Sequence, residues 1–424
     1  MDRNTLRQVI LEQKEIILNE PYVRREYELE PNINYCFVGM RRSGKTFLMY
    51  HQIHEFLNSG GEENHFTYVN FEDERLLEMK TEDLNLILEI AHELAGPGIK
   101  PLLFLDEIHN VAGWDHFARR LADMKYRVSI TGSNSKMLSS EIASTLGARF
   151  MVCDVYPYSF REYRKADHGS DEEQSPSTTA KRAETISQFN EYRINGGFPE
   201  LLGIKGKKPY LNNIFNTVLL GDIITRNSIS NPFAMRLIIK KLAESIMTPL
   251  SYSRLTNVVA GTGLAIGKST VINYVDYAKE AFLFFSIQNY ASKLADKETN
   301  PKYYFVDHGL IGLFVNDPVS LQLENLVAVE LRRRFGKENV FFFERNVEVD
   351  FYVPDANIAI QVCKVLHKDD ATFKRETEAL IKLAGFLPGT ECLILTDSEE
   401  EKLTVNDVNI SVLPIWKWLL KENS

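Results

Sequence analysis

Gly39-Met40-Arg41-Arg42-Ser43-Gly44-Lys45-Thr46 is the stretch that decides the fold of this 424-residue chain. It completes the pattern G-x-x-x-x-G-K-[ST]. The apolar run 35–38 precedes it, and 47–50 follows as the start of a helix, so the pattern lies between a predicted strand and a predicted helix. In that context the backbone N–H groups of the loop hold phosphate oxygens, and the helix N-terminus adds positive potential. The stretch therefore predicts a binding site for a nucleoside triphosphate.

The side chains of this loop have separate expected roles. Lys45 is expected to reach the β- and γ-phosphates, and Thr46 to place its hydroxyl on Mg²⁺. No guanine-reading N-K-x-D motif follows the nucleotide domain, and the choice of ATP over GTP comes from the family resemblance given below. The other residues of the loop that we expect to contact the nucleotide are Gly39, Arg42, Ser43 and Gly44.

A second apolar run, 101–105, ends in Asp106 and Glu107 about 60 residues after the loop. Parallel strands of an α/β sheet bring their carboxyl ends to the edge where the ligand lies. Asp106 is therefore expected to hold Mg²⁺ through water, and Glu107 to orient or deprotonate the attacking water. This pair predicts hydrolysis as well as binding.

Three further residues are candidates for the same site. The apolar run 127–131 ends near Ser133 and Asn134, which either sense the γ-phosphate or simply form a turn, since Gly, Ser and Asn favour turns. Arg149 is either a solvated surface charge or an arginine finger that stabilises the transferring phosphate.

The composition indicates a globular protein of two to four domains. No run approaches the length of a membrane span, and residues 1–8 lack the apolar core of a secretory signal. The four cysteines are widely separated and lie in or beside apolar runs, so we expect buried free thiols and a cytoplasmic location. The net charge of −9 works against non-specific attraction to nucleic acid.

Together these motifs resemble a family of prokaryotic AAA-type ATPases that join a P-loop domain to a winged helix and a C-terminal restriction-endonuclease-like domain of unknown role. The resemblance is carried by the phosphate loop and by 105–107, 131–134, 156–163 and 196–200. It implies an α/β fold with an AAA-type P-loop NTPase parallel sheet, a helical lid, a winged helix and a restriction-endonuclease-like α/β domain. The expected boundaries are 1–165 for the P-loop domain, 166–185 for a polar flexible linker, 186–231 for the lid, 232–315 for the winged helix-turn-helix and 320–424 for the nuclease-like domain.

The pattern of 232–290 is that of a winged helix-turn-helix. The segment 268–278 is interpreted as the recognition helix, and apolar strands near 282–285 and 303–306 as the wing. The alternatives are DNA contact and internal packing. Candidates for contacts to phosphates and base edges are Lys268, Ser269, Asn273, Tyr274 and Lys279.

Glu324, Asp350 and Gln361 follow the helix-then-strands order of a PD-(D/E)XK nuclease core. Such a site also needs a lysine, which would activate water beside the metal. The expected lysine position is Cys363, and Lys364 is displaced by one residue, to the opposite face of a strand. We therefore expect a vestigial site that does not cut DNA.

The resulting hypothesis is an ATP- and Mg²⁺-dependent ATPase whose nucleotide state controls the winged helix and the degenerate nuclease-like domain. Its expected partners are the nucleotide, an unknown protein and, through the winged helix, DNA, with no membrane. Two alternatives stay open. One is an ATP-controlled DNA nuclease, and the other is a non-enzymatic, nucleotide-dependent switch or protein-interaction module.

Overall fold

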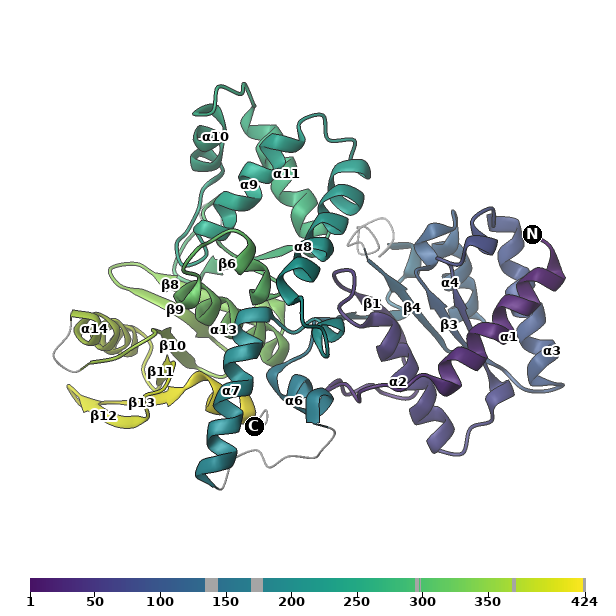
Figure 1. The fold of residues 1–424 in the computed structure, drawn as a ribbon, viewed down its shortest axis with the longest axis horizontal. Coiled ribbons are helices and arrows are strands. Elements are labelled where there is room, and N and C mark those ends of the chain that lie inside the picture. The colour runs from purple at the N-terminus through teal and green to yellow at the C-terminus, as the bar shows by residue number, and fades with distance from the viewer. Residues whose placement is uncertain (134–143, 169–177, 294–296, 298, 368–370, 422–424) are drawn as a thin grey trace. The chain divides into compact units, whose positions relative to one another are not determined.

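The computed structural model describes residues 1–133, 144–168, 178–293, 297, 299–367 and 371–421 (Figure 1). The chain divides into two compact units. Unit 1 comprises Met1–Tyr156 with Glu280–Phe282, and unit 2 comprises Pro157–Lys279 with Leu283–Ser424. None of the helices in the described parts of the chain combines the length and the apolar character that crossing a bilayer requires.

Unit 1 is built on a sheet of five strands in the order β2-β3-β4-β1-β5. Every neighbouring pair is parallel. Four of these strands are almost fully buried, as is typical of a parallel sheet covered on both faces, whereas the edge strand β5 is more exposed. The strands are β1 (Asn34–Val38), β2 (Phe66–Asn70), β3 (Leu102–Asp106), β4 (Val128–Gly132) and β5 (Phe150–Asp154).

Helices cover both faces of this sheet (Figure 1). The alternation of each strand sends Cys36 and Val38 into one core and Tyr35 and Phe37 into the other. The first core is closed mainly by α1, α3 and α4, and the second by α2. The helices are α1 (Arg3–Asn19), α2 (Lys45–Asn58), α3 (Leu84–Ala95) and α4 (Trp114–Asp123).

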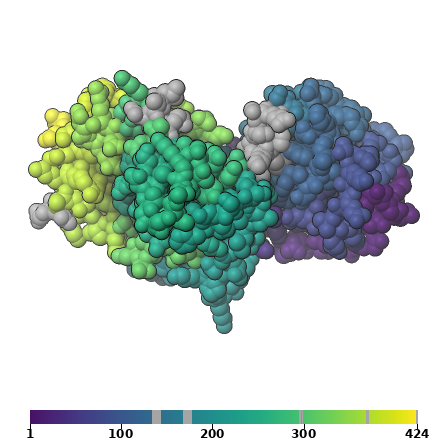
Figure 2. Space-filling view, turned by 90° about the horizontal axis from the view of Figure 1, so that it is seen from above, coloured from purple at the N-terminus to yellow at the C-terminus, as the bar shows by residue number. Residues whose placement is uncertain are grey.

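Unit 2 begins with helices, whose teal-to-green surface is seen in Figure 2. The α8 helix continues as a π-helical stretch over Val218–Thr225. The helices are α6 (Phe160–His168), α7 (Thr179–Asn195), α8 (Lys207–Thr217), α9 (Pro232–Glu244), α10 (Tyr252–Ala260) and α11 (Lys268–Glu280).

The rest of unit 2 is organised by a mixed sheet of eight strands in the order β12-β13-β11-β10-β9-β8-β6-β7. One face packs on α14 through a core that includes Leu380 and Leu383. The strands are β6 (Phe284–Asn289), β7 (Lys302–Phe305), β8 (Phe341–Glu344), β9 (Glu348–Val353), β10 (Ile358–Val362), β11 (Glu391–Thr396), β12 (Glu401–Val405) and β13 (Val408–Pro414). The accompanying helices are α13 (Val319–Phe335), α14 (Ala371–Phe386) and α15 (Ile415–Leu420).

Two local expectations need correction. The hairpin β6–β7, expected as a separate wing, pairs antiparallel as a wing would, but β6 also pairs with β8 and so extends the eight-stranded sheet. Residues 179–185, expected within a flexible linker, begin α7, where the Thr178 hydroxyl caps the helix by accepting from Lys181 N. Residues 169–177 lie outside the described residues.

All four cysteines are free thiols, as expected. Cys36, Cys363 and Cys392 are buried, and Cys153 is half-buried.

Candidate nucleotide site

The phosphate loop connects β1 to α2 at the carboxyl end of the unit 1 sheet. At Gly39 an added Cβ would meet the carbonyl oxygen of Val155 at 2.2 Å, so any side chain there would displace the loop. Gly44 precedes α2 with φ of 97°, a left-handed conformation that glycine adopts without strain. These two glycines let the backbone fold closely around the position of the phosphates.

Lys45 is the buried cation of this loop. Its side chain is 5% exposed, and its Nζ donates to the carbonyl oxygens of Gly39 and Met40 at 3.1 and 3.2 Å. The hydroxyl of Ser43 is buried and has no hydrogen-bond partner among the described residues. A buried ammonium and a buried hydroxyl without a partner fit a loop that receives phosphate oxygens.

Arg25, which the sequence analysis missed, braces the loop from behind. It is buried, and its guanidinium donates to the carbonyl oxygens of Ser43 at 3.2 Å and Tyr156 at 2.7 Å. An arginine in a polar N-terminal segment carries no sequence signal for this role. It ties the phosphate loop to the segment that follows β5.

Asp106 is the centre of the hydrogen bonds at the end of β3. Its Oδ2 accepts from the Thr46 hydroxyl at 2.8 Å and from the Tyr68 hydroxyl at 2.7 Å, and its Oδ1 accepts from the Thr131 hydroxyl. The carboxylate is fully buried, and this burial raises the pKa of Asp106 above its usual range, with neighbouring Glu107 adding to the effect. A cation bound beside the buried Asp106 carboxylate is also favoured, because it compensates a charge that solvent does not reach.

Glu107 is held in a defined position next to Asp106. Its φ of 52° is a left-handed conformation that costs a non-glycine residue energy and that persists where the surroundings impose it. Its backbone N–H donates to Thr131 Oγ1 at 2.8 Å, and its Oε2 accepts from Ser133 N at 3.1 Å. His109 Nδ1 lies 3.3 Å from the same Oε2.

These groups fit a magnesium ion bound with a nucleotide. Mg²⁺ takes oxygen ligands, and it binds proteins through one or two such groups together with phosphates and water. Thr46 Oγ1 and the Asp106 carboxylate lie next to each other at the loop, as such a site needs. The structure also brings Lys45 Nζ within 3.6 Å of Glu107 Oε1, so the expected phosphate-binding and water-activating groups converge.

Two other candidates are placed differently. Arg149 precedes β5, which runs parallel to β1 with Asn34 opposite Phe150, so Arg149 lies at the far end of the sheet from the loop. It pairs there with Asp123 and donates to the Gly147 carbonyl at 3.0 Å. The structure therefore does not bring Arg149 to the nucleotide site of its own chain.

Of the remaining candidates, Ser133 is buried beside Glu107 and has a hydroxyl without a partner among the described residues. Asn134 lies outside the described residues. Arg42, another candidate, lies within the loop and has a left-handed backbone conformation with φ of 63°. The sequence did not reveal Tyr68 and Thr131 as hydrogen-bond donors to the Asp106 carboxylate, although Thr131 lies near the end of β4, the strand next to β3.

Comparisons with known proteins agree with this geometry. Residues 32–164 match the model of a family described as AAA domain, and residues 186–318 match a domain of unknown function, DUF8612. An uncharacterized protein of Methanocaldococcus jannaschii is 32% identical over 97% of this chain and 94% of its own length. The chain belongs to the family of this archaeal protein.

Other similarities are weaker. An uncharacterized protein of Haemophilus influenzae is 26% identical over 90% of this chain and 93% of its own length. A Walker-type ATPase of Pyrococcus abyssi has a TM-score of 0.44 and 13% identity over 70% of this chain and 99% of that one. The AAA match and the loop geometry together indicate nucleotide binding and ATPase activity.

Outside the AAA domain, the expected nuclease residues are only partly brought together. Glu324 and Asp350 both lie within 3.6 Å of a lysine, Lys302, that the sequence analysis missed. Gln361 instead braces β9, with its Oε1 accepting from Asp350 N at 2.7 Å. Lys364 is exposed.

The candidate DNA contacts on α11 are divided by burial. Lys268, Ser269 and Asn273 are exposed, whereas Tyr274 is 5% exposed and belongs to the core. Tyr274 is therefore not available for base contacts. Lys279 pairs with Asp276 at 3.7 Å.

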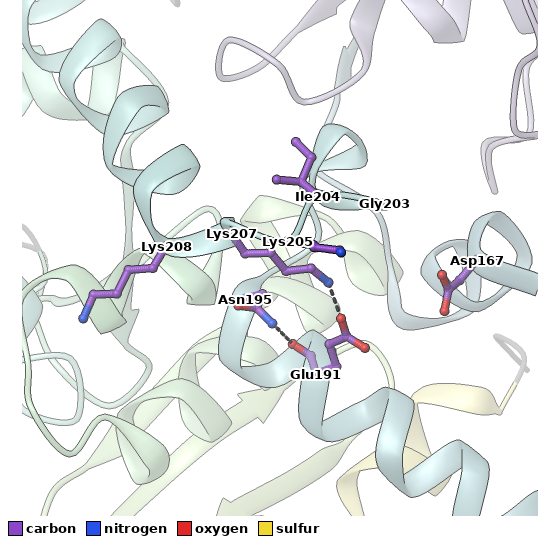
Figure 3. Close-up of a pocket in the computed structure, with 8 residues that line it drawn as sticks. All are labelled: Asp167, Glu191, Asn195, Gly203, Ile204, Lys205, Lys207 and Lys208. Atoms are coloured by element: carbon purple, nitrogen blue, oxygen red, sulfur yellow. Dashed lines mark hydrogen bonds and ion pairs between the residues drawn. The ribbon is translucent and has the colours of Figure 1, made fainter.

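A separate polar pocket of about 550 Å³ lies among α6, α7 and the start of α8 (Figure 3). Lys207 points to Glu191 and pairs with it, whereas Lys208 points away. The lysines of this pocket therefore do not converge on one anion, and we assign it no ligand.

Proposed function

We propose that the chain is an Mg²⁺-dependent ATPase of AAA type that binds ATP at the phosphate loop. The observation that best supports the proposal is the hydrogen-bond network around Asp106. It joins Thr46 of the loop to the carboxylate at the end of β3 and, through Thr131, to the backbone of Glu107. One network thus positions the groups for binding phosphate and the group for activating water.

Each residue has a defined part in the proposed reaction. Lys45 donates to the phosphate oxygens, and Ser43 lies beside them with a buried hydroxyl that has no partner among the described residues. Glu107 orients the attacking water and accepts its proton. Thr46 and Asp106 hold Mg²⁺, which when bound neutralises charge on the phosphates.

The proposal extends to unit 2, whose winged helix and degenerate nuclease-like domain respond to the nucleotide state. The succession of α9, α10 and α11 before the hairpin β6–β7 supports a winged helix. The succession of α13 before β8, β9 and β10, with Glu324 and Asp350 side by side, supports a nuclease-like core. DNA contact would use the exposed residues of α11, and an unknown protein is the other partner. Four free thiols fit action in the reducing cytoplasm.

The test is phosphate release from ATP by the purified full-length chain, in Mg²⁺ and in EDTA, with and without duplex DNA, alongside a measurement of size. We expect release that needs Mg²⁺ and that Asp106→Asn abolishes. The matched control is Asp123→Asn, which removes a half-exposed aspartate at the far end of the sheet. Tight ATP binding with no release above the Asp106→Asn background would instead identify a non-enzymatic switch.

A further inference from the structure

Lys302 on β7 lies among three carboxylates in unit 2. Its Nζ is 2.9 Å from Glu348 Oε1 and 3.6 Å from both Glu324 Oε1 and Asp350 Oδ1. The side chains of Lys302 and Glu324 are completely buried. A buried ammonium is costly unless anionic partners compensate it, so this placement requires the cluster.

The carboxylates are held by further contacts. Tyr304, also on β7, donates its hydroxyl to Glu324 Oε1 at 2.7 Å, and Val362 N donates to Asp350 Oδ2 at 2.9 Å. The ring of Phe342 lies 5.4 Å from the ammonium, close enough for a cation–π contact. These groups together favour a positive charge at the position of the Lys302 ammonium.

One ammonium faces more than one negative charge. Glu376 on α14 adds negative charge near Asp350, and the adjacent Arg375 partly offsets it. The other oxygen of Glu324, Oε2, is buried without a hydrogen-bond partner among the described residues. The site therefore favours a bound cation, and the cation nearest to it is the ammonium of Lys302.

We propose that Lys302 is the resident cation of this carboxylate site and takes the place that a divalent metal ion would need. The site then holds the hairpin β6–β7 against α13 and β9, and it does not cut phosphodiesters. The inference does not depend on the nucleotide site.

Two observations favour a resident lysine over a metal with a catalytic lysine. No group of three or more His, Cys, Asp or Glu within the described residues is arranged to hold a metal ion. The Lys302 side chain is also 0% exposed, so a DNA phosphate has no access to its ammonium. A lysine that stabilises developing charge must touch the reacting group.

The first experiment measures Mn²⁺ binding to the nucleotide-free full-length chain, as wild type and as Asp350→Asn. We expect equal binding, because any Mn²⁺ held at the phosphate loop is common to both. Mn²⁺ binding that the wild type shows and Asp350→Asn loses would overturn the proposal. Plasmid cleavage in Mn²⁺ that Asp350→Asn abolishes would overturn it equally.

The second experiment compares the thermal stability of Lys302→Met, Glu324→Gln and the double variant at pH 8. Leaving buried carboxylates without their cation should lower the Tm by about 10 °C. The matched control Lys279→Met removes a half-exposed lysine and should change the Tm by about 1 °C. Adding Glu324→Gln to Lys302→Met should recover part of the loss, since the amide needs neither a cation nor a bound proton in the buried site. A double variant no more stable than Lys302→Met would contradict the proposal.

Discussion

The ammonium Nζ of Lys45 lies 3.6 Å from the carboxylate Oε1 of Glu107. The residue that should bind phosphate is thus paired with the residue that should act on water. Because both side chains are buried, neither charge is well screened by solvent. We expect the Lys45 ammonium to pair with the phosphates when ATP binds. Glu107 then no longer pairs with Lys45 and can accept a proton from the attacking water.

Lys45→Ala should remove nucleotide binding in the micromolar range. Hydrogen bonds to charged groups contribute about 1.5–3 kcal/mol each, so losing two phosphate contacts costs about 10²-fold or more in affinity. Equilibrium binding of a labelled ATP analogue measures the effect. Lys80→Ala, at an exposed lysine of the same unit, is the control and should bind normally. Unchanged affinity of Lys45→Ala would show that the phosphates bind elsewhere.

Glu107→Gln should leave nucleotide binding intact and slow hydrolysis by about 10²-fold or more, as expected for loss of a positioned base. The amide keeps the shape of the side chain and removes its charge. Lys45 then no longer has an ion-pair partner at position 107 that competes with the phosphates. Single-turnover phosphate release, measured beside equilibrium binding, separates the two effects. Turnover at the wild-type rate would move the water-positioning role to another group, with Ser133 the next candidate.

Thr131→Val should slow hydrolysis with little effect on ATP affinity. The Thr131 hydroxyl donates to Asp106 and accepts from Glu107 N, so valine leaves both unsatisfied at nearly unchanged volume. Losing such a bond to a buried charged group costs about 1.5–3 kcal/mol, or about 10- to 10²-fold in rate. Thr131→Ser retains the hydroxyl and should restore most of the rate. Equal defects in valine and serine variants would indicate that packing, and not the hydroxyl, matters.

The nucleotide site was largely predictable because its chemistry is local in the sequence. The loop from Gly39 to Thr46 and the pair Asp106–Glu107 are each continuous, and burial of their strands follows from apolar runs. The partners of Asp106 were not predictable in the same way. Tyr68 and Thr131 contact Asp106 only because β2, β3 and β4 are adjacent in the sheet. No single segment of the sequence determines the order of the strands.

Unit 2 shows the same limit more clearly. The sequence motif predicts the lysine near Cys363, on the same strand as Gln361. The structure supplies Lys302 from β7, about 60 residues earlier, through pairing of the hairpin with the larger sheet. Arg149 was a candidate for the nucleotide site from the sequence, but the parallel register of β5 with β1 places it far from the loop.

The last prediction concerns pH and Glu324. Burial raises the folded-state pKa of Glu324 to about 8, above the value of about 4.3 expected in an unfolded chain. Between these two values the folded protein binds more protons than the unfolded protein, so the free energy of unfolding decreases as pH rises. Glu324→Gln removes this titration and mimics the protonated acid.

The Tm of Glu324→Gln relative to wild type should therefore increase as pH rises from 5 to 9, by about 3 °C or more. Asp350 and Glu376 are present in both proteins, so only the part of their ionisation that depends on the charge of Glu324 remains in the difference. Thermal melts of the two proteins in matched ionic strength at each pH measure it. Glu348→Gln, at a half-exposed carboxylate of the same cluster, is the matched control for the loss of a carboxylate next to Lys302. A Tm difference that stays constant or decreases toward pH 9 would show that Glu324 is already ionised in the folded protein, with Lys302 fully compensating its charge.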